Sequence, residues 1–108
     1  MNYKTVATKV FEKELKSLFK KYRSIKDDLK TLEQELLENP KMGIYLGKDV
    51  YKIRLAIKSK GKGKSGGARV ITHIKVIEET VYLLSIYDKS SSDSISDDAI
   101  IELLKDIE

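Results

Sequence analysis

Apolar side chains recur at helical spacing in two runs before Pro40. The first run follows Thr8 and comprises Val10, Phe11, Leu15, Leu18, Phe19 and Tyr22. The second run follows Ser24 and comprises Ile25, Leu29, Leu32, Leu36 and Leu37. This period is typical of amphipathic helices, and a hydroxyl side chain before each run suits an N-cap. We therefore predict a hairpin of two helices, capped at Thr8 and Ser24 and ended at Pro40.

The period of the pattern changes to 2 in the second half of the chain. In Tyr51–Lys58, apolar residues alternate mostly with basic ones, which is typical of a strand with one buried face. Ala68–Val76 and Val81–Asp88 also have strand-forming sequences, and a tight turn is expected between them. These three strands should pair in chain order as an antiparallel meander. A brief further strand is predicted over Tyr3–Ala7.

A last helix is predicted near the C-terminus. Ser96 suits its N-cap, acidic residues follow in the first turn, and Ala99–Ile107 carries apolar residues at helical spacing. The predicted fold is α+β: a small antiparallel sheet, formed by the meander and the N-terminal strand, with the helix hairpin packed on one face and a C-terminal helix. With 108 residues, the chain is expected to form a single domain over residues 1–108.

If the helices cover one face of the sheet, the other face is left open for function. Strand alternation predicts that this face displays Lys52, Arg54, Arg69, His73, Ser85, Tyr87 and Lys89. Cations gathered on one surface repel one another unless an anion neutralises them. The pattern of the strands therefore predicts an anion-binding face.

The distribution of charge strengthens this prediction. The segment from Lys41 to Lys75 holds ten Lys or Arg and one acid, Asp49, for a net charge of +9. The whole chain has 21 Lys and Arg against 17 Asp and Glu, a net charge of +4, so the remaining residues sum to −5. Positive charge segregated in this way favours a polyanion, and nucleic acid is the first partner to consider.

A glycine-rich run, Lys60–Arg69, lies inside the basic segment and contains Lys62 and Lys64. It ends like a nucleotide-binding P-loop, but the earlier glycine of that motif would fall at Lys58, and the run lies between two strands. Two interpretations remain. The run is either a flexible hairpin tip kept soluble by lysines, or a phosphate contact through Lys62, Lys64 and backbone N–H groups. Its position beside Arg69 favours the contact.

Composition narrows the chemistry further. Cysteine is absent and His73 is the one histidine, and the acidic residues lie outside the basic strands, so we expect no metal site and no cofactor. With 41% apolar and 35% charged residues and no long apolar run, the chain is expected to be a folded cytoplasmic protein without a membrane span.

A basic face can cleave RNA without a metal. The internal 2′-hydroxyl is the nucleophile, so the protein needs a proton acceptor, cations on the phosphorane and a proton donor for the leaving oxygen. His73 is either a general base or an incidental strand residue. Tyr87 either stacks on a nucleobase or packs against the protein.

Three stretches are similar to a known protein family: Val50–Leu55, Lys60–Ile71 and Leu83–Lys89. They resemble type II toxins of the RelE/ParE superfamily, and the resemblance covers essentially the whole chain. The glycine-rich run followed by Ile-Tyr-Asp-Lys resembles the HigB-like branch of the RelE family. The resemblance implies the RelE fold and an mRNA interferase, an endoribonuclease that cuts mRNA in the ribosomal A site and is neutralised by a cognate antitoxin.

The resemblance also implies a catalytic set: Lys52, Arg54, Arg69 and Lys89. Lys52 and Arg54 stand at the family's lysine pair for proton abstraction and phosphate binding. Arg69 matches its arginine that stabilises the transition state, and Lys89 stands where RelE-type enzymes have the arginine proposed as general acid. Because arginine is essentially never deprotonated, Lys52 is the better candidate for the base.

The chain departs from the family at its base-stacking tyrosine, where Ile95 stands, so Tyr87 is the candidate replacement. The predicted RNA-binding residues are Lys62, Lys64, His73 and Tyr87. An alternative function is a non-catalytic toxin or binding module on the same fold, such as a ParE-type DNA gyrase inhibitor. Those toxins generally lack the basic quartet, so its presence favours the ribonuclease.

Overall fold

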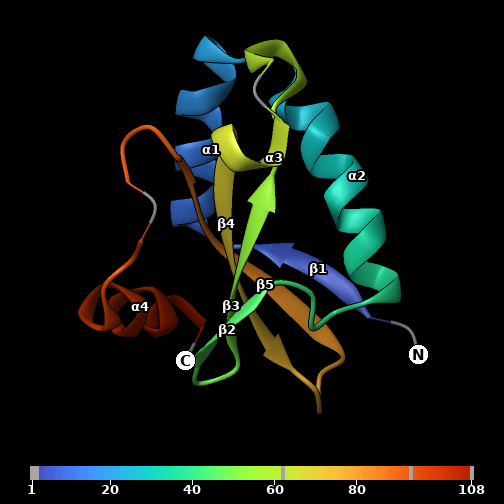
Figure 1. Cartoon of the computed structure of the whole chain (residues 1–108). Helices are drawn as coiled ribbons and strands as arrows, with labels where there is room; N and C mark the ends of the chain where they lie inside the picture. The colour runs from blue at the N-terminus through green and yellow to red at the C-terminus, as the bar shows by residue number, and fades with distance from the viewer. Residues whose placement is uncertain (1–2, 62, 93, 108) are drawn as a thin grey trace.

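The computed structural model describes residues 3–61, 63–92 and 94–107, without the side chains of Lys64 and Ser65. Its strands are β1 Lys4–Ala7, β2 Ile44–Gly47, β3 Val50–Leu55, β4 Ala68–Lys75 and β5 Thr80–Asp88. Its helices are α1 Lys9–Lys21, α2 Ile25–Glu38, α3 Gly63–Gly66 and α4 Asp97–Leu104, with short 3-10 turns at Lys58–Lys60 and Lys105–Ile107. The predicted α+β class, helix hairpin and meander are confirmed (Figure 1).

The sheet has five strands in the order β1-β5-β4-β3-β2. The meander β3-β4-β5 is antiparallel, but β1 joins β5 in parallel, with Lys4 opposite Thr80, so the sheet is mixed rather than wholly antiparallel. The edge strand β2 was not predicted from the sequence. It pairs with β3 through a two-residue turn, Lys48 and Asp49, whose positive φ angles of 53° and 59° are those of a type I′ hairpin turn, which suits the right-handed twist of the strands.

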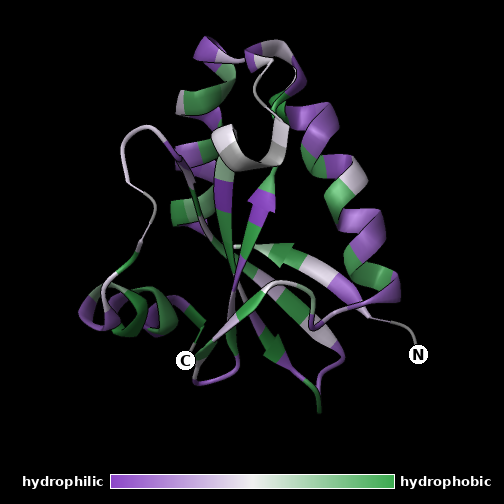
Figure 2. Ribbon diagram, in the orientation of Figure 1, coloured by the Kyte–Doolittle hydropathy of each residue, from purple (hydrophilic) through white to green (hydrophobic). Residues whose placement is uncertain are grey.

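The helix hairpin covers one face of the sheet and forms the main core. Apolar residues of α1 and α2, such as Phe11 and Leu36, pack on inward-facing strand residues such as Ile53 and Val70. Figure 2 shows this pattern as hydrophobic stripes on helices whose outer sides are hydrophilic. The apolar residues at helical spacing and those at strand spacing therefore pack together in one buried layer.

The two predicted caps of the helix hairpin have different outcomes. Thr8 caps α1 as predicted, because its Oγ1 accepts a hydrogen bond from the Phe11 N–H at 3.2 Å. Ser24 precedes α2, but its side chain makes no capping bond. Its hydroxyl instead donates to Asp28 Oδ2 and lies 2.9 Å from the hydroxyl of Ser59. The predicted role of Ser24 as a side-chain cap is thus wrong, since tertiary contacts engage the hydroxyl.

Replacing Thr8 by Ala is expected to lower the free energy of unfolding by about 1 kcal/mol, the usual value of an N-cap. The Thr8 hydroxyl also lies 3.3 Å from the Leu83 carbonyl, so the change loses a contact with β5 as well. Urea denaturation measures the effect, with Ser17→Ala on the exposed side of α1 as the control. Equal stability of the two variants contradicts the capping role.

The opposite face of the sheet is not left open along its whole length, contrary to prediction. Helix α4 packs there through Ile100, which joins Val50, Ile71 and Leu84 in a second apolar cluster. The sequence pattern missed this arrangement because a β-bulge opposite Ile71 adds one residue to β5 and turns Leu84 toward α4. The face therefore has an apolar half under α4 and a second half that α4 does not cover.

Candidate active site

The uncovered half of this face is organised around one rung of the sheet. Arg54 of β3 lies opposite Arg69 of β4, and Arg69 lies opposite Tyr87 of β5. Paired residues of neighbouring antiparallel strands have Cα atoms about 4.5–5.5 Å apart and point to the same side. The two guanidinium groups are therefore brought together by backbone pairing, with the tyrosine beside them.

Two lysines flank this rung. Lys52 lies two residues before Arg54 on β3, so it shares the same face, and it is half-buried. Lys89 follows the end of β5 and is exposed, and its backbone N–H donates to the Gly67 carbonyl at 3.0 Å. This bond places the Lys89 backbone beside Gly67, one position beyond the pair of Ala68 and Asp88 and two residues after Tyr87. The predicted catalytic residues are thus gathered in one place.

Arg69 differs from the other three cations because it is buried, with 2% of its surface exposed. Its Nη1 donates to the Ala68 carbonyl at 3.1 Å. Because so little of it is exposed, the side chain is held in place by the groups packed around it. In contrast, Arg54 is exposed. Of the two guanidinium groups, that of Arg54 is therefore the one accessible from solvent.

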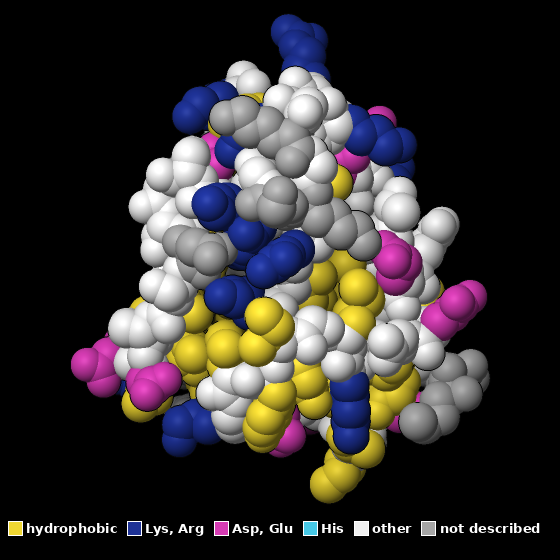
Figure 3. Space-filling view, in the orientation of Figure 1, with side chains coloured by type: hydrophobic (Ala, Val, Ile, Leu, Met, Phe, Trp, Pro, Cys, Tyr) yellow, Lys and Arg dark blue, Asp and Glu magenta, His cyan; other side chains and the backbone are white. Residues whose placement is uncertain are grey.

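Figure 3 shows Lys and Arg side chains gathered in the middle of this face, next to a broad hydrophobic area. The described residues on the basic side are Lys52, Arg54, Arg69 and Lys89. Along the described parts of the chain, no three His, Cys, Asp or Glu side chains lie together as candidate metal ligands. Within the same residues, no helix has both the length and the apolar run that a membrane span requires.

The glycine-rich run is more structured than a free hairpin tip. It begins at the last residue of the 3-10 turn Lys58–Lys60, contains helix α3 and returns to the sheet at Gly67. A Cβ on Gly67 would lie 2.0 Å from the Leu55 oxygen and 3.0 Å from the Ile57 nitrogen, so only glycine fits this approach to β3. Of the two predicted phosphate contacts, Lys62 lies outside the described residues and Lys64 outside the described side chains.

His73 does not join the basic group. It sits opposite Val50 and Tyr82, four residues and about 13 Å along β4 from Arg69, and it lines a small pocket with Leu104. Burial lowers the pKa of its imidazole, although the nearby Asp49 carboxylate partly offsets this effect. The neutral form of the ring is therefore favoured. The role of His73 in RNA binding stays a prediction, and the distance from Arg69 does not support it.

Ser85 was predicted to be displayed on the basic face, but it is buried, with 4% of its surface exposed. Its hydroxyl donates to Glu14 Oε1 of α1 at 2.9 Å and so is not available to a ligand on that face. Burial raises the pKa of Glu14, and the hydrogen bonds from Ser85 and the Ile86 N–H act against that rise. Tyr87 does lie on the predicted face and packs partly against the apolar cluster under α4.

Sequence reasoning missed an ion pair behind this site. Lys60 Nζ lies 2.6 Å from Asp88 Oδ1, and the side chains are only 10% and 5% exposed. Lys60 was counted among the cations that face a polyanion, whereas the structure pairs it inside the protein. The acid of the Ile-Tyr-Asp-Lys motif, next to a candidate catalytic lysine, was the feature of the sequence that pointed to such a partner.

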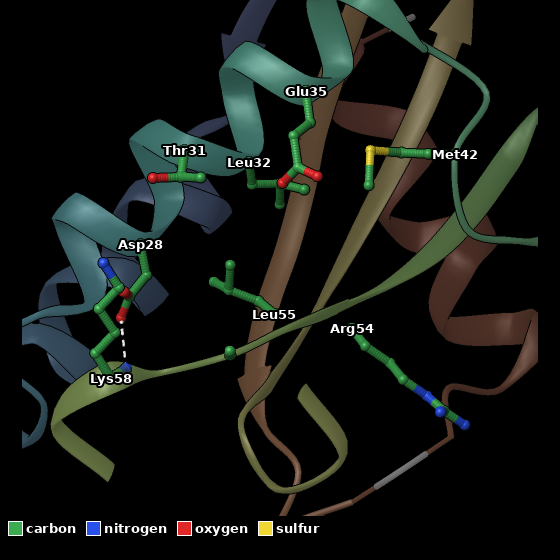
Figure 4. Close-up of a pocket in the computed structure, with 9 residues that line it drawn as sticks. Asp28, Thr31, Leu32, Glu35, Met42, Arg54, Leu55 and Lys58 are labelled. Carbon is green, nitrogen blue, oxygen red and sulfur yellow. Dashed lines mark hydrogen bonds between the residues drawn. The ribbon is translucent and has the colours of Figure 1, made fainter. Parts of the chain in front are cut away.

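A separate pocket of about 130 Å³ opens between α2 and β3 (Figure 4). Leu32, Met42 and Leu55 give the pocket an apolar lining. Asp28 lies at one end, where its carboxylate accepts a hydrogen bond of 3.1 Å from the Lys58 N–H. Arg54 borders this pocket, but its side chain points away from α2. The pocket is thus not part of the basic group.

Comparison with known proteins assigns this architecture to a family. The model of the RelE toxin of the RelE/RelB toxin-antitoxin system matches residues 4–106. The chain belongs to this family. The match includes every strand and helix of the RelE-type domain described above, together with its basic rung. RelE, after which the family model is named, is the toxin of that toxin-antitoxin system.

A solved structure supports the same fold. This RelE-family chain superposes on a double arginine-to-alanine mutant of the E. coli toxin RelE in the free state, with a TM-score of 0.66. The two sequences are 23% identical, and the match covers 100% of each chain. Because the sequence identity is low, the superposition establishes the fold alone, with its mixed sheet and helix hairpin.

Proposed function

We propose that this RelE-family toxin is a HigB-like mRNA interferase that cuts mRNA in the ribosomal A site. The observation that carries the proposal is the rung of Arg54 and Arg69, with Lys52 and Lys89 on either side of it. Arg54 and Lys89 are exposed there, Lys52 is half-buried, and Arg69 lies buried beside them in the sheet. Such a group suits a phosphodiester whose charge increases in the transition state.

Each residue has a distinct role in the proposed reaction. Lys52, in its neutral form, takes the proton from the 2′-hydroxyl of the nucleotide before the cut, and that oxygen attacks the adjacent phosphorus. Arg54 and Arg69 hold the negative oxygens of the phosphorane, and Lys89 gives a proton to the departing 5′-oxygen. The products are a 2′,3′-cyclic phosphate and a 5′-hydroxyl end, without participation of a metal ion.

The partners follow from the same proposal. The toxin acts on mRNA held by the ribosome, and a cognate antitoxin neutralises it. We expect the antitoxin to bind through a segment with acidic side chains, because such a segment complements the charge of the basic face and would compete with RNA for it. The glycine-rich run and the Ile-Tyr-Asp-Lys sequence support the HigB-like branch.

The chemistry is tested by a single 2′-deoxy substitution in the mRNA at the nucleotide before the cut. We expect cleavage at that position to fall below detection, because the nucleophile is missing. The same mRNA with the 2′-deoxy group one nucleotide downstream is the control and should be cut normally. Undiminished cleavage of the first substrate means that water or another group attacks, and that the proposed mechanism is wrong.

A further inference from the structure

The buried carboxylate of Asp88 accepts hydrogen bonds from three groups. Besides the ion pair with Lys60, Asp88 Oδ2 accepts a hydrogen bond of 2.6 Å from the Tyr22 hydroxyl, and Oδ1 accepts the Ser90 N–H at 3.0 Å. Burial alone would raise the pKa of Asp88, but these hydrogen bonds outweigh it and hold the pKa well below its usual range. The carboxylate therefore stays charged, and the hydrogen bond to it raises the pKa of Tyr22.

This ion pair joins two segments that border the basic face. Lys60 stands where the glycine-rich run begins, and Asp88 immediately precedes Lys89. The far end of the run is fastened to the same place, because Ala68 pairs with Asp88 and the Gly67 carbonyl accepts the Lys89 N–H. Both ends of the run are thus held at the end of β5, within two residues of Tyr87.

The turn that leads into the run is also fixed. Ser59 donates its N–H to Ser24 Oγ at 2.8 Å, and the Lys58 N–H donates to the buried Asp28. These contacts dock Lys58–Lys60 on the start of α2 and set the direction from which the Lys60 side chain reaches Asp88. The Lys60 ammonium also lies 5.4 Å from the centre of the Tyr22 ring.

The net stability of such a pair does not explain its presence. Desolvation offsets most of the attraction within a buried ion pair, and apolar replacements of similar size are often as stable. A buried carboxylate with all its hydrogen bonds made holds its partners in defined positions, because each donor must approach from a particular direction. The geometry fixed here is that of the glycine-rich run and of Lys89.

We propose that Asp88 and Lys60 are positioning residues for RNA cleavage, which hold Lys89 and the glycine-rich run in place beside the rung of Arg54 and Arg69. This inference rests on the proposed function of the face. Lys60 acts through Asp88 and does not contact RNA, in spite of its place in the basic segment. Its loss is therefore expected to slow the chemical step rather than weaken substrate binding.

The test uses the full chain and ribosomes with a defined codon in the A site. Lys60→Met keeps the length of the side chain and removes its charge, and Lys60→Arg keeps the charge. We expect kcat of Lys60→Met to fall at least about tenfold with KM unchanged, and Lys60→Arg to recover most of the loss. Lys16→Met, on the exposed side of α1, is the matched control and should retain wild-type kinetics.

Hydrogen exchange of the Lys89 amide gives a second readout that needs no catalysis. Its bond to Gly67 should open more often in Lys60→Met, so exchange is expected to be at least about tenfold faster than in the wild-type protein. If Lys60→Met does not fold, Tyr22→Phe removes one hydrogen bond from Asp88 and should shift kcat and exchange in the same direction.

Two results overturn the inference. A raised KM at unchanged kcat shows that Lys60 binds RNA directly, and unchanged kcat together with unchanged Lys89 exchange shows that the pair positions nothing. If the wild-type toxin cuts no mRNA, the proposed function fails instead. In that case the exchange rate of Lys89 still decides whether the ion pair holds the site together.

Discussion

Replacing Arg69 by Ala is expected to lower the single-turnover rate of mRNA cleavage by about 10²–10³-fold, the usual loss for one preorganised donor at a developing oxyanion. The effect should exceed that of Arg54→Ala, because Arg69 is buried and fixed whereas Arg54 is exposed. A fixed guanidinium needs no reorganisation as charge builds on the phosphorane. An exposed one must be ordered first and competes with water.

The rate comparison needs a folded variant and a matched arginine. Arg23→Ala removes an exposed arginine at the junction of α1 and α2 and is expected to cleave at nearly the wild-type rate. Because Arg69→Ala leaves a cavity, its melting temperature is measured first and all rates are taken well below it. Arg69→Lys retains the charge without the planar fork and should recover only part of the loss. Full activity of Arg69→Ala contradicts its place in the site.

Gly67→Ala is expected to destabilise the fold by about 3 kcal/mol or more, the upper range for an overpacked position. The added Cβ would meet the Leu55 oxygen at 2.0 Å, and both partners are backbone, so neither side can rotate away. For a chain of this size, that loss lowers the melting temperature by about 12 °C or more. The backbone must shift at the entry to β4, which also moves the carbonyl that binds the Lys89 N–H.

Gly61→Ala is the control for this second prediction. Gly61 has a φ of 73° with open space around its Cβ position, so the substitution carries the strain of a left-handed conformation, about 1–2 kcal/mol, without a clash. Thermal denaturation followed by circular dichroism compares the two variants. A Gly67→Ala variant no less stable than Gly61→Ala would show that the close approach to β3 is not required.

The elements with strong periodicity were predictable from the sequence. The runs that begin at Val10 and Ile25 became α1 and α2, and the alternation in Tyr51–Lys58 became β3. The same alternation placed Lys52 and Arg54 on one face and Arg69 across from them, so the centre of the site followed from local pattern and strand pairing. Antiparallel neighbours in a meander leave few alternatives for such pairing.

Other features depended on contacts that a local pattern does not contain. The strand β2 has only four residues and two of them are exposed, so it shows no alternation. The position of α4 depended on a bulge in β5, which leaves Leu84 without a partner in the register and places it in the apolar cluster under α4. The pairing of Lys60 with Asp88 joins residues 28 positions apart. The charge count over Lys41–Lys75 included Lys60 but not Asp88, so it could not reveal the pair.

Primer extension on an mRNA under translation tests the central claim most directly. The toxin, Arg54→Ala and Arg69→Ala are compared in reactions with and without ribosomes. We predict cuts that appear only with ribosomes and only with the wild-type toxin, at fixed positions within codons. If the wild-type chain produces no cut under any condition while its expression still arrests growth, the basic face is not a ribonuclease site, and inhibition of DNA gyrase becomes the function to examine.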